Sequence, residues 1–266
     1  MANDHGKLWQ RLPAPIRQGI AWTASQARWS RDRLRGEPWA PPRGLVSFGS
    51  FRRLEPFNRF SGGGRGVPVD RYYIDRFLQA HAADIRGRAL EIAEPMYIRR
   101  FGGDRVERVE VLHVTGDTPE TTIVGDLTAA DHIPSDSFDC VILTQTLHCI
   151  FDVHAAVSTL HRILKPGGVV LATFPGIANI SRPDMDRWGQ YWSFTSLSAQ
   201  LVFEEAFGGG HVEVESHGNV LAATAFLWGM AAQELTRDEL EHRDQDYQLL
   251  LTVKATKAAG NAAGAG

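Results

Sequence analysis

Three acidic residues lie within or directly after apolar runs, where a carboxylate could bind a ligand. Glu91 and Glu110 lie inside such runs, and Asp126 follows a third. A carboxylate accepts hydrogen bonds from amines and hydroxyls, and burying its charge is costly unless a partner compensates. For Glu91 that partner is either a bound ligand or a basic neighbour such as Arg88. These acids are therefore candidate ligand-binding residues.

Structural roles also explain two of these acids. Glu110 is equally consistent with a solvated glutamate at the edge of a strand. Asp126 precedes Thr128, and Asp commonly bonds the backbone two residues on in an Asx turn, or caps a short helix. Gly125 allows the backbone to approach a ligand closely, so we favour a binding role for Asp126.

A second polar group follows the most apolar run, Phe138–Thr144. It contains Thr144, Gln145 and His148. The unperturbed pKa of histidine lies near neutrality, so His148 could accept a proton from a hydroxyl nucleophile. Two observations weaken that role: a histidine that opens a helix is often only solvated, and many group transfers to oxygen need little beyond alignment of the reactants.

A long connector at residues 181–192 follows the apolar run 169–174. Its flat aromatic faces would suit stacking on a sugar, and its charged groups would suit the sugar hydroxyls. In the alternative, the tryptophans only cover the end of the sheet. The residues concerned are Arg182, Asp184, Trp188, Tyr191 and Trp192.

Strands that alternate with helices must position these residues. Apolar runs and turn residues predict strands at 88–93, 109–114, 122–124, 138–144, 169–174, 212–216 and 247–255, and helices at 70–86, 152–164, 195–207 and 222–235. In that arrangement Asp70 caps the first helix, and residues 165–168 form the turn after the second. The pattern predicts a doubly wound α/β fold with a mostly parallel, seven-stranded sheet. Such sheets bind ligands outside the carboxyl ends of their strands, where the candidates lie.

The composition excludes several classes. A net charge of −3 gives no global argument for binding nucleic acid, and 43% apolar residues suffice for a large core. Cys140 and Cys149 lie in apolar surroundings and are expected to be buried thiols, with no metal-binding spacing. Without a signal peptide or a membrane-spanning run, the expected location is the cytoplasm.

The N-terminus differs from the rest of the chain. We expect a helical extension and linker at residues 1–66, a folded domain at 67–257 and a disordered tail at 258–266. Seven basic residues precede Gly36, interleaved with Trp9, Trp22 and Trp29. They could form an interfacial helix that contacts anionic lipid or a protein partner. Two prolines interrupt the first turns, so we favour an accessory extension whose tryptophans pack on the domain.

Three segments together resemble the class I S-adenosylmethionine-dependent methyltransferases of the type 11 group. They are Leu90–Ala93, Val124–Leu127 and residues 137–171, which contain the sequence LKPGG. The resemblance extends from about residue 87 to residue 257. Residues 65–74 are also similar to the lead-in of a bacterial subgroup often encoded near glycosyltransferases. The resemblance implies a Rossmann-like fold and S-adenosylmethionine as cofactor.

The resemblance also assigns roles. It implies transfer of a methyl group to a hydroxyl or amine of a sugar or related small bacterial metabolite, with His148 as the candidate base. The cofactor would contact Glu91, Ala93, Glu110, Asp126, Leu127, Thr144 and Gln145, and the acceptor would contact Tyr72, Arg182, Asp184, Trp188, Tyr191 and Trp192.

The chain departs from the family where the Gly-x-Gly-x-Gly loop should follow the first strand. Those three positions are Ala93, Pro95 and Tyr97. Glycine there allows positive φ and lets backbone N–H groups approach the cofactor. Two alternatives therefore stay open: a cofactor-free binding protein that partners a glycosyltransferase, or a different reaction on the same fold.

Overall fold

The computed structural model describes residues 12–36, 40–42 and 44–259. The chain divides into two compact units, residues 1–54 and residues 55–266. The first contains helix α2 (Ala14–Arg35) and a short 3-10 turn at Gly49–Phe51. The predictions for Trp9 and for the last seven tail residues lie outside the described residues.

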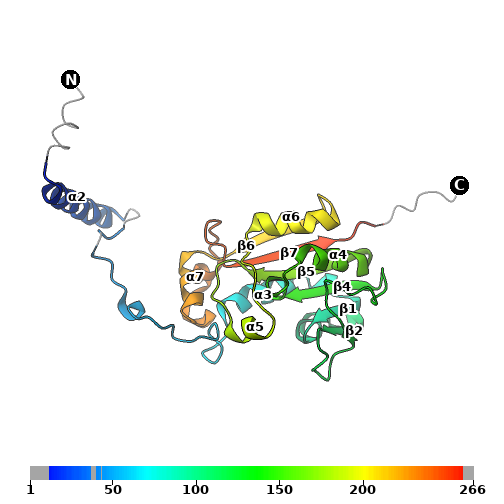
Figure 1. The fold of residues 1–266 in the computed structure, drawn as a ribbon. Coiled ribbons are helices and arrows are strands. Elements are labelled where there is room, and N and C mark those ends of the chain that lie inside the picture. The colour runs from blue at the N-terminus through cyan, green and yellow to red at the C-terminus, as the bar shows by residue number, and fades with distance from the viewer. Residues whose placement is uncertain (1–11, 37–39, 43, 260–266) are drawn as a thin grey trace. The chain divides into compact units, whose positions relative to one another are not determined.

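The second unit is built on one seven-stranded sheet with the order β3-β2-β1-β4-β5-β7-β6 (Figure 1). All neighbouring pairs are parallel except those that involve β7, which is antiparallel to both β5 and β6. The strands are β1 (Gly87–Ile92), β2 (Val106–His113), β3 (Ile123–Val124), β4 (Phe138–Thr144), β5 (Leu164–Pro175), β6 (Val212–His217) and β7 (Leu250–Thr256). The predicted fold class is confirmed.

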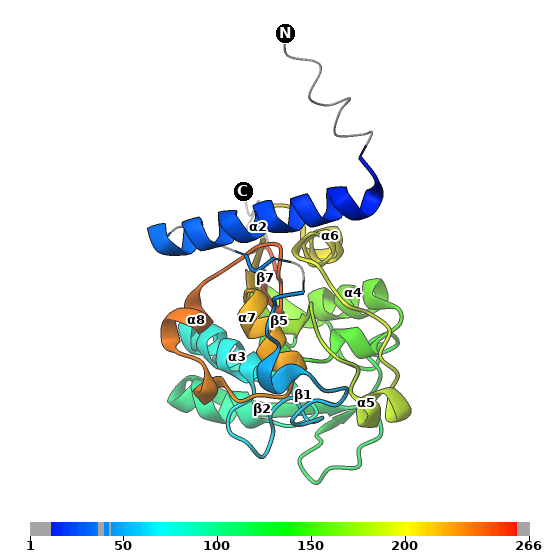
Figure 2. The same ribbon diagram turned by 90° about the vertical axis from the view of Figure 1, so that its left-hand side faces the viewer.

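Helices cover both faces of this sheet because the central strands are apolar on both sides. Helices α4 (Val153–Ile163) and α6 (Ser196–Phe207) pack on one face (Figure 1). Helices α3 (Val69–Ala80) and α7 (Val220–Leu227) pack on the other (Figure 2). Side chains alternate along β4, so Val141 faces α4 while Ile142 faces α3.

Two helix starts follow the sequence signals. The Asp152 carboxylate accepts a hydrogen bond of 3.0 Å from the Ala155 amide, which satisfies one free N–H of α4. Thr195 caps α6 in a reciprocal arrangement with Ser198.

The predicted cap at Asp70 is wrong. Helix α3 begins one residue earlier, at Val69, after Pro68 as N-cap. The fixed φ of Pro68 already directs the chain into the helix, so no side chain is needed as a cap. Asp70 instead lies buried in the first turn and accepts a 2.8 Å hydrogen bond from the Arg71 amide.

The predicted helix 222–235 is also wrong, because α7 ends at Leu227. A turn follows at Gly229, whose φ is +68°. A Cβ atom there would lie 1.9 Å from the Asn58 carbonyl oxygen, so the lead-in segment is pressed against this turn. A short helix α8 (Arg237–Glu241) that the sequence did not predict then follows. The residues predicted as a turn after α4, 165–168, belong to β5.

The lead-in segment belongs to the folded unit. The Phe57 amide donates a 2.9 Å hydrogen bond to the Trp228 carbonyl, and Arg65 pairs with Glu234 at 2.6 Å. The structure therefore groups residues 55–66 with the domain, whereas the sequence analysis placed them in the linker.

Candidate functional site

The backbone turns sharply where β1 ends. Ala93 adopts a left-handed conformation with φ of +73°, and its amide donates a 2.9 Å hydrogen bond to the Leu112 carbonyl of β2. A residue with a Cβ atom pays roughly 1–2 kcal/mol for that conformation. The turn that glycine would adopt is thus retained without glycine, and Ala93 is exposed at the strand end.

Glu91 holds the loop after this turn. Its side chain is 2% exposed and accepts hydrogen bonds from the amides of Tyr97 at 3.0 Å and Ile98 at 2.8 Å. Burial raises the pKa of Glu91 to about 7, which outweighs the opposing effect of the two amides. The partner of this acid is the loop backbone rather than Arg88, which pairs with Glu110 instead.

The two bulky residues of the loop are directed into the protein. Pro95 is buried. Tyr97 is 2% exposed, and its ring stacks on that of Phe101 with 6.2 Å between the ring centroids. The Tyr97 hydroxyl accepts a 3.1 Å hydrogen bond from Arg71 of α3. The Arg71 side chain is 38% exposed and its guanidinium also lies 4.0 Å from the Asp70 carboxylate, so its exposed part is a candidate to bind a further carboxylate near the loop. Sequence reasoning missed Arg71, because only the packing of α3 on the loop reveals it.

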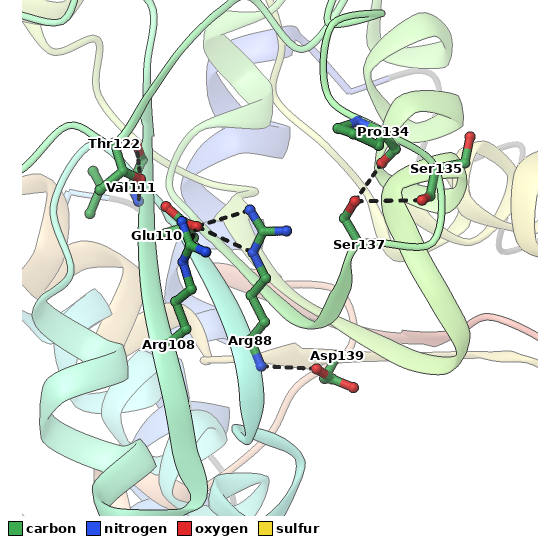
Figure 3. Close-up of polar contacts among 9 residues, drawn as sticks. All are labelled: Arg88, Arg108, Glu110, Val111, Thr122, Pro134, Ser135, Ser137 and Asp139. Atoms are coloured by element: carbon green, nitrogen blue, oxygen red, sulfur yellow. Dashed lines mark hydrogen bonds and ion pairs between the residues drawn. The ribbon is translucent and has the colours of Figure 1, made fainter.

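Glu110 lies in the middle of β2, paired in register with Leu90. Figure 3 shows the guanidinium groups of Arg88 and Arg108 directed toward its carboxylate. The Glu110 carboxylate forms ion pairs with Arg88 at 2.9 Å and with Arg108 at 2.6 Å. Burial alone would raise the pKa of Glu110, but hydrogen bonding from Thr122 and the two guanidinium groups lower it below its usual range. The predicted contact with the cofactor stays a prediction, and one oxygen of this carboxylate, Oε1, already receives both arginines.

The last residue of β2 is His113, not Glu110. Its Nδ1 atom accepts hydrogen bonds from the amides of Thr115 at 3.2 Å and Gly116 at 3.1 Å. Those two donors require a lone pair on Nδ1, so the ring proton of the neutral imidazole resides on Nε2. The end of β2 therefore offers the Nε2–H group of His113 as a hydrogen-bond donor, whereas the sequence predicted an acidic side chain from this strand.

Asp126 is exposed just after β3. Its Oδ1 atom accepts hydrogen bonds from the amide of Thr128 at 2.8 Å and from its hydroxyl at 2.9 Å. This is the Asx turn anticipated as the alternative, yet a carboxylate has a second oxygen for a ligand. Leu127 is buried in the core below α4, so only its backbone could contact a cofactor.

The end of β4 presents a second left-handed residue. Gln145 has φ of +46°, and its amide donates a 2.8 Å hydrogen bond to the Thr173 carbonyl of β5. Thr144 precedes it on the strand and is half-buried. The carboxyl ends of β1 and β4 are adjacent, so Gln145 and Ala93 lie at the same edge of the sheet.

His148 is 6% exposed in a single turn (Leu147–Cys149) after β4. Among the described residues, its Nδ1 atom has no hydrogen-bond partner. Burial lowers the pKa of His148 to about 4, with the charge of Asp184 opposing the shift. The imidazole is therefore neutral at physiological pH and has an open nitrogen, although a pKa this low makes it a weak base.

The connector after β5 crosses the strand ends as a strap, which we define as residues 181–192, including helix α5 (Arg182–Arg187). Its outer part reaches β2: Arg187 pairs with Asp117 at 2.8 Å, and the Trp188 ring packs edge-on against His113 at 5.8 Å. Two segments far apart in the sequence are thus joined above the edge of the sheet.

The second end of the strap is tied to the loop after β4. The Tyr191 amide donates a 2.8 Å hydrogen bond to the His148 carbonyl, and the Trp192 indole N–H donates a 3.0 Å bond to the Ile150 carbonyl. Both rings pack on Phe151, which is 69% exposed. Phe151, Tyr191 and Trp192 form an exposed aromatic wall. The sequence analysis did not include Phe151, because a single exposed aromatic residue gives no signal by itself.

Other predicted acceptor residues lie apart from this wall or are engaged. Tyr72 donates a 3.2 Å hydrogen bond to Glu241, close to an open groove of about 280 Å³ between α3 and the strands β6 and β7. Arg182 is paired with Asp186 along α5. Asp184 is half-buried and its carbonyl accepts the Trp188 amide at 2.7 Å.

Comparison with known proteins gives the same interpretation of the fold. Residues 61–172 match the family model of a methyltransferase domain. This match covers less than half of the chain and shows that the matched part resembles methyltransferase domains. The predicted resemblance is thereby confirmed.

Two relatives illustrate the similarity. A ubiquinone/menaquinone biosynthesis C-methyltransferase of Haemophilus ducreyi is 32% identical over 71 residues, which is 26% of each chain. The aligned part of this chain thus spans about a quarter of that relative's length. An S-adenosylmethionine-dependent methyltransferase of Archaeoglobus fulgidus shares the fold with a TM-score of 0.50 and 11% identity, covering 74% of this chain and 98% of its own. Within the described part of this methyltransferase-like chain, no helix is long and apolar enough to span a membrane.

Proposed function

We propose that the domain binds S-adenosylmethionine at the carboxyl ends of β1, β3 and β4 and passes its methyl group to a hydroxyl or amine of a small metabolite. A sugar is the first acceptor class to test. The cofactor supplies an electrophilic methyl group, so the chain itself contributes placement and exclusion of water.

The observation that carries this proposal is the conformation of Ala93. The strained, exposed turn persists although alanine disfavours it, and Glu91 stabilises the loop behind it. Strain of this kind is retained where function requires it. The side chains of Pro95 and Tyr97 are turned into the protein, so the residues present fit the amino-acid part of the cofactor beside Ala93 and Arg71.

Polar groups for the nucleoside part lie on the neighbouring strands. Asp126 offers an acceptor for an adenine amino group, and Gln145 offers backbone and side-chain groups at the end of β4. His113 offers a donor at the end of β2, and Trp188 lies against it in the strap. The strap would limit the access of water to this region.

The aromatic wall supports the acceptor class. Tyr191 and Trp192 are 51% and 40% exposed, and their rings lie beside Phe151. Sugars bind to flat aromatic faces of this kind, with charged groups for their hydroxyls. The His148 carbonyl accepts the Tyr191 amide, so this residue adjoins the wall, and its buried, unpaired Nδ1 atom is the candidate acceptor for the proton of a hydroxyl.

Transfer of a radiolabelled methyl group to a panel of sugars, amino sugars and phenolic metabolites tests this function. We expect incorporation with at least one panel member and its loss in Trp192→Ala. Arg237→Ala, an exposed change on α8, is the matched control. If S-adenosylmethionine does not bind at millimolar concentration, a cofactor-free partner protein becomes the better interpretation. Binding without transfer to any panel member would favour another reaction on the same fold.

A further inference from the structure

Helix α2 has no buried residue over its 22 residues. It forms because Pro13 and Pro15 fit the helix start, and it ends at Gly36, whose left-handed conformation lets its amide bond the carbonyls of Asp32 and Arg33. A helix of this length in a globular protein normally buries one face. The exposed apolar side chains of α2 therefore raise the question of what covers them.

The side chains of α2 form two neighbouring stripes. At about 100° per residue, Ile16, Ile20, Ala27 and Leu34 fall on one line along the helix. Ile16, Ile20 and Leu34 are 50%, 45% and 88% exposed. An exposed apolar stripe is unfavourable in water, so this surface suits an apolar partner.

A basic stripe runs beside the apolar one. Arg17, Arg28 and Arg35 fall on a line about 100–120° around the helix from Ile16. Within the described part of the chain, none of these three arginines makes an ion pair with an acidic side chain. The sole acid of the helix, Asp32, pairs with Arg31 at 2.8 Å.

The charge of this helix is opposite to that of the whole protein. Its five arginines and one aspartate give +4, whereas the complete chain carries −3. Electrostatic attraction to an anionic partner is therefore a property of α2 and not of the chain as a whole. Aliphatic side chains directly beside arginines fit the boundary between lipid headgroups and acyl chains better than a nucleic-acid backbone, which has no apolar layer.

We propose that α2 binds parallel to the surface of an anionic lipid bilayer, with Ile16, Ile20 and Leu34 in the acyl boundary and the arginines at the headgroups. The helix lies on the bilayer rather than across it, because it is too polar to span one. This inference does not depend on the activity of the domain.

Flotation of the full chain with vesicles tests the proposal. We expect binding to phosphatidylglycerol vesicles, little binding to phosphatidylcholine vesicles, and a decline as salt increases from 50 to 300 mM. Each arginine near an anionic surface contributes roughly fivefold to binding, so Arg17→Ser with Arg28→Ser should lower the partition roughly 25-fold. Arg59→Ser with Arg86→Ser, two exposed changes in the domain, is the matched control and should leave it unchanged.

A second variant separates apolar insertion from charge attraction alone. Ile20→Ser with Leu34→Ser keeps every charge and should also lower the partition by tenfold or more. No binding to phosphatidylglycerol, or binding unaffected by either pair of changes, overturns the proposal. Binding to a single-stranded oligonucleotide without binding to vesicles also overturns it and assigns α2 to nucleic acid instead.

Discussion

The carboxylate of Glu91 and the backbone amide of Tyr97 are joined by hydrogen bonds of 3.0 Å, so a buried acid of β1 fixes the loop that follows it. The same carboxylate accepts the Ile98 amide at 2.8 Å. This relationship places the acid in a supporting role: it shapes the turn at Ala93, and any cofactor would meet the exposed backbone above it.

Removal of the Glu91 carboxylate should therefore destabilise the fold. Glu91→Ala leaves two buried amides without acceptors, at roughly 1–3 kcal/mol each, so we expect the free energy of unfolding to fall by about 2–6 kcal/mol. Glu91→Gln keeps an acceptor oxygen and should cost less than about 1 kcal/mol. Urea denaturation measures both, with the exposed Glu107→Ala as control. Equal losses in the two Glu91 variants would contradict this role.

Ala93 should tolerate glycine better than any larger residue. Ala93→Gly removes a steric cost of roughly 1–2 kcal/mol and adds about 0.5–1 kcal/mol of chain entropy, so stability should stay equal or rise slightly. Ala93→Val should lower it by about 2 kcal/mol, because branched side chains fit positive φ poorly. Thermal unfolding tests the pair. Ala129→Gly, at an exposed turn position without positive φ, should destabilise; the same loss from Ala93→Gly would contradict a strained turn.

His217 should make stability dependent on pH. Burial, followed by the charge of Arg243, lowers the pKa of His217 from 6.5 to about 4. Between these values the unfolded chain binds a proton that the folded chain does not. Stability is therefore lost as pH falls from about 6.5 to about 4, by up to roughly 1.4 kcal/mol per pH unit.

The variant His217→Gln isolates this contribution, because an amide can still bond Thr252, which lies 3.1 Å from the His217 ring. The difference in unfolding free energy between variant and native protein should change by about 1 kcal/mol or more between pH 7 and pH 5. His148 acts in the same direction and Glu91 in the opposite one, so only this difference is diagnostic. A difference that does not vary with pH would contradict a buried neutral His217.

The strap should control how fast the cofactor leaves. Trp188→Ala removes the contact with His113, and we expect the dissociation rate of S-adenosylhomocysteine to rise about tenfold, as for the loss of one aromatic contact. Asp117→Ala breaks only the ion pair with Arg187, whose side chains are both 55% exposed, and leaves the Arg187 guanidinium over the Trp188 ring, so it should change the rate less than about threefold. Stopped-flow fluorescence measures both rates. A larger effect from Asp117→Ala than from Trp188→Ala would contradict this assignment.

The sequence predicted the sheet well because its strands are apolar on both faces. Phe138–Thr144 begins and ends at the predicted residues, and the Asp152 cap makes the predicted bond. The end of α7 could not be predicted, since it depends on the Asn58 carbonyl packing against Gly229 from a segment distant in the sequence.

The candidate site was less predictable for the same reason. Sequence position placed Glu110 near the strand end, but the strand continues to His113, and two arginines engage the acid. Likewise, the missing glycines left alternatives to cofactor binding open, and the sequence did not reveal that Tyr97 turns toward Arg71 while Ala93 keeps the turn. Side-chain direction in an irregular loop follows from its packing partners, and the chain order does not reveal them.

Titration calorimetry of the full chain with S-adenosylhomocysteine tests the central claim most directly. Asp126→Asn keeps the turn with Thr128 but replaces one acceptor oxygen by an amide N–H, so it should weaken binding about tenfold. Asp131→Asn, an exposed change nearby, should leave binding unchanged. Micromolar binding by the native chain with this contrast between the variants is the predicted result. No heat of binding at millimolar ligand, or equal affinities in all three proteins, would contradict a cofactor site at the strand ends.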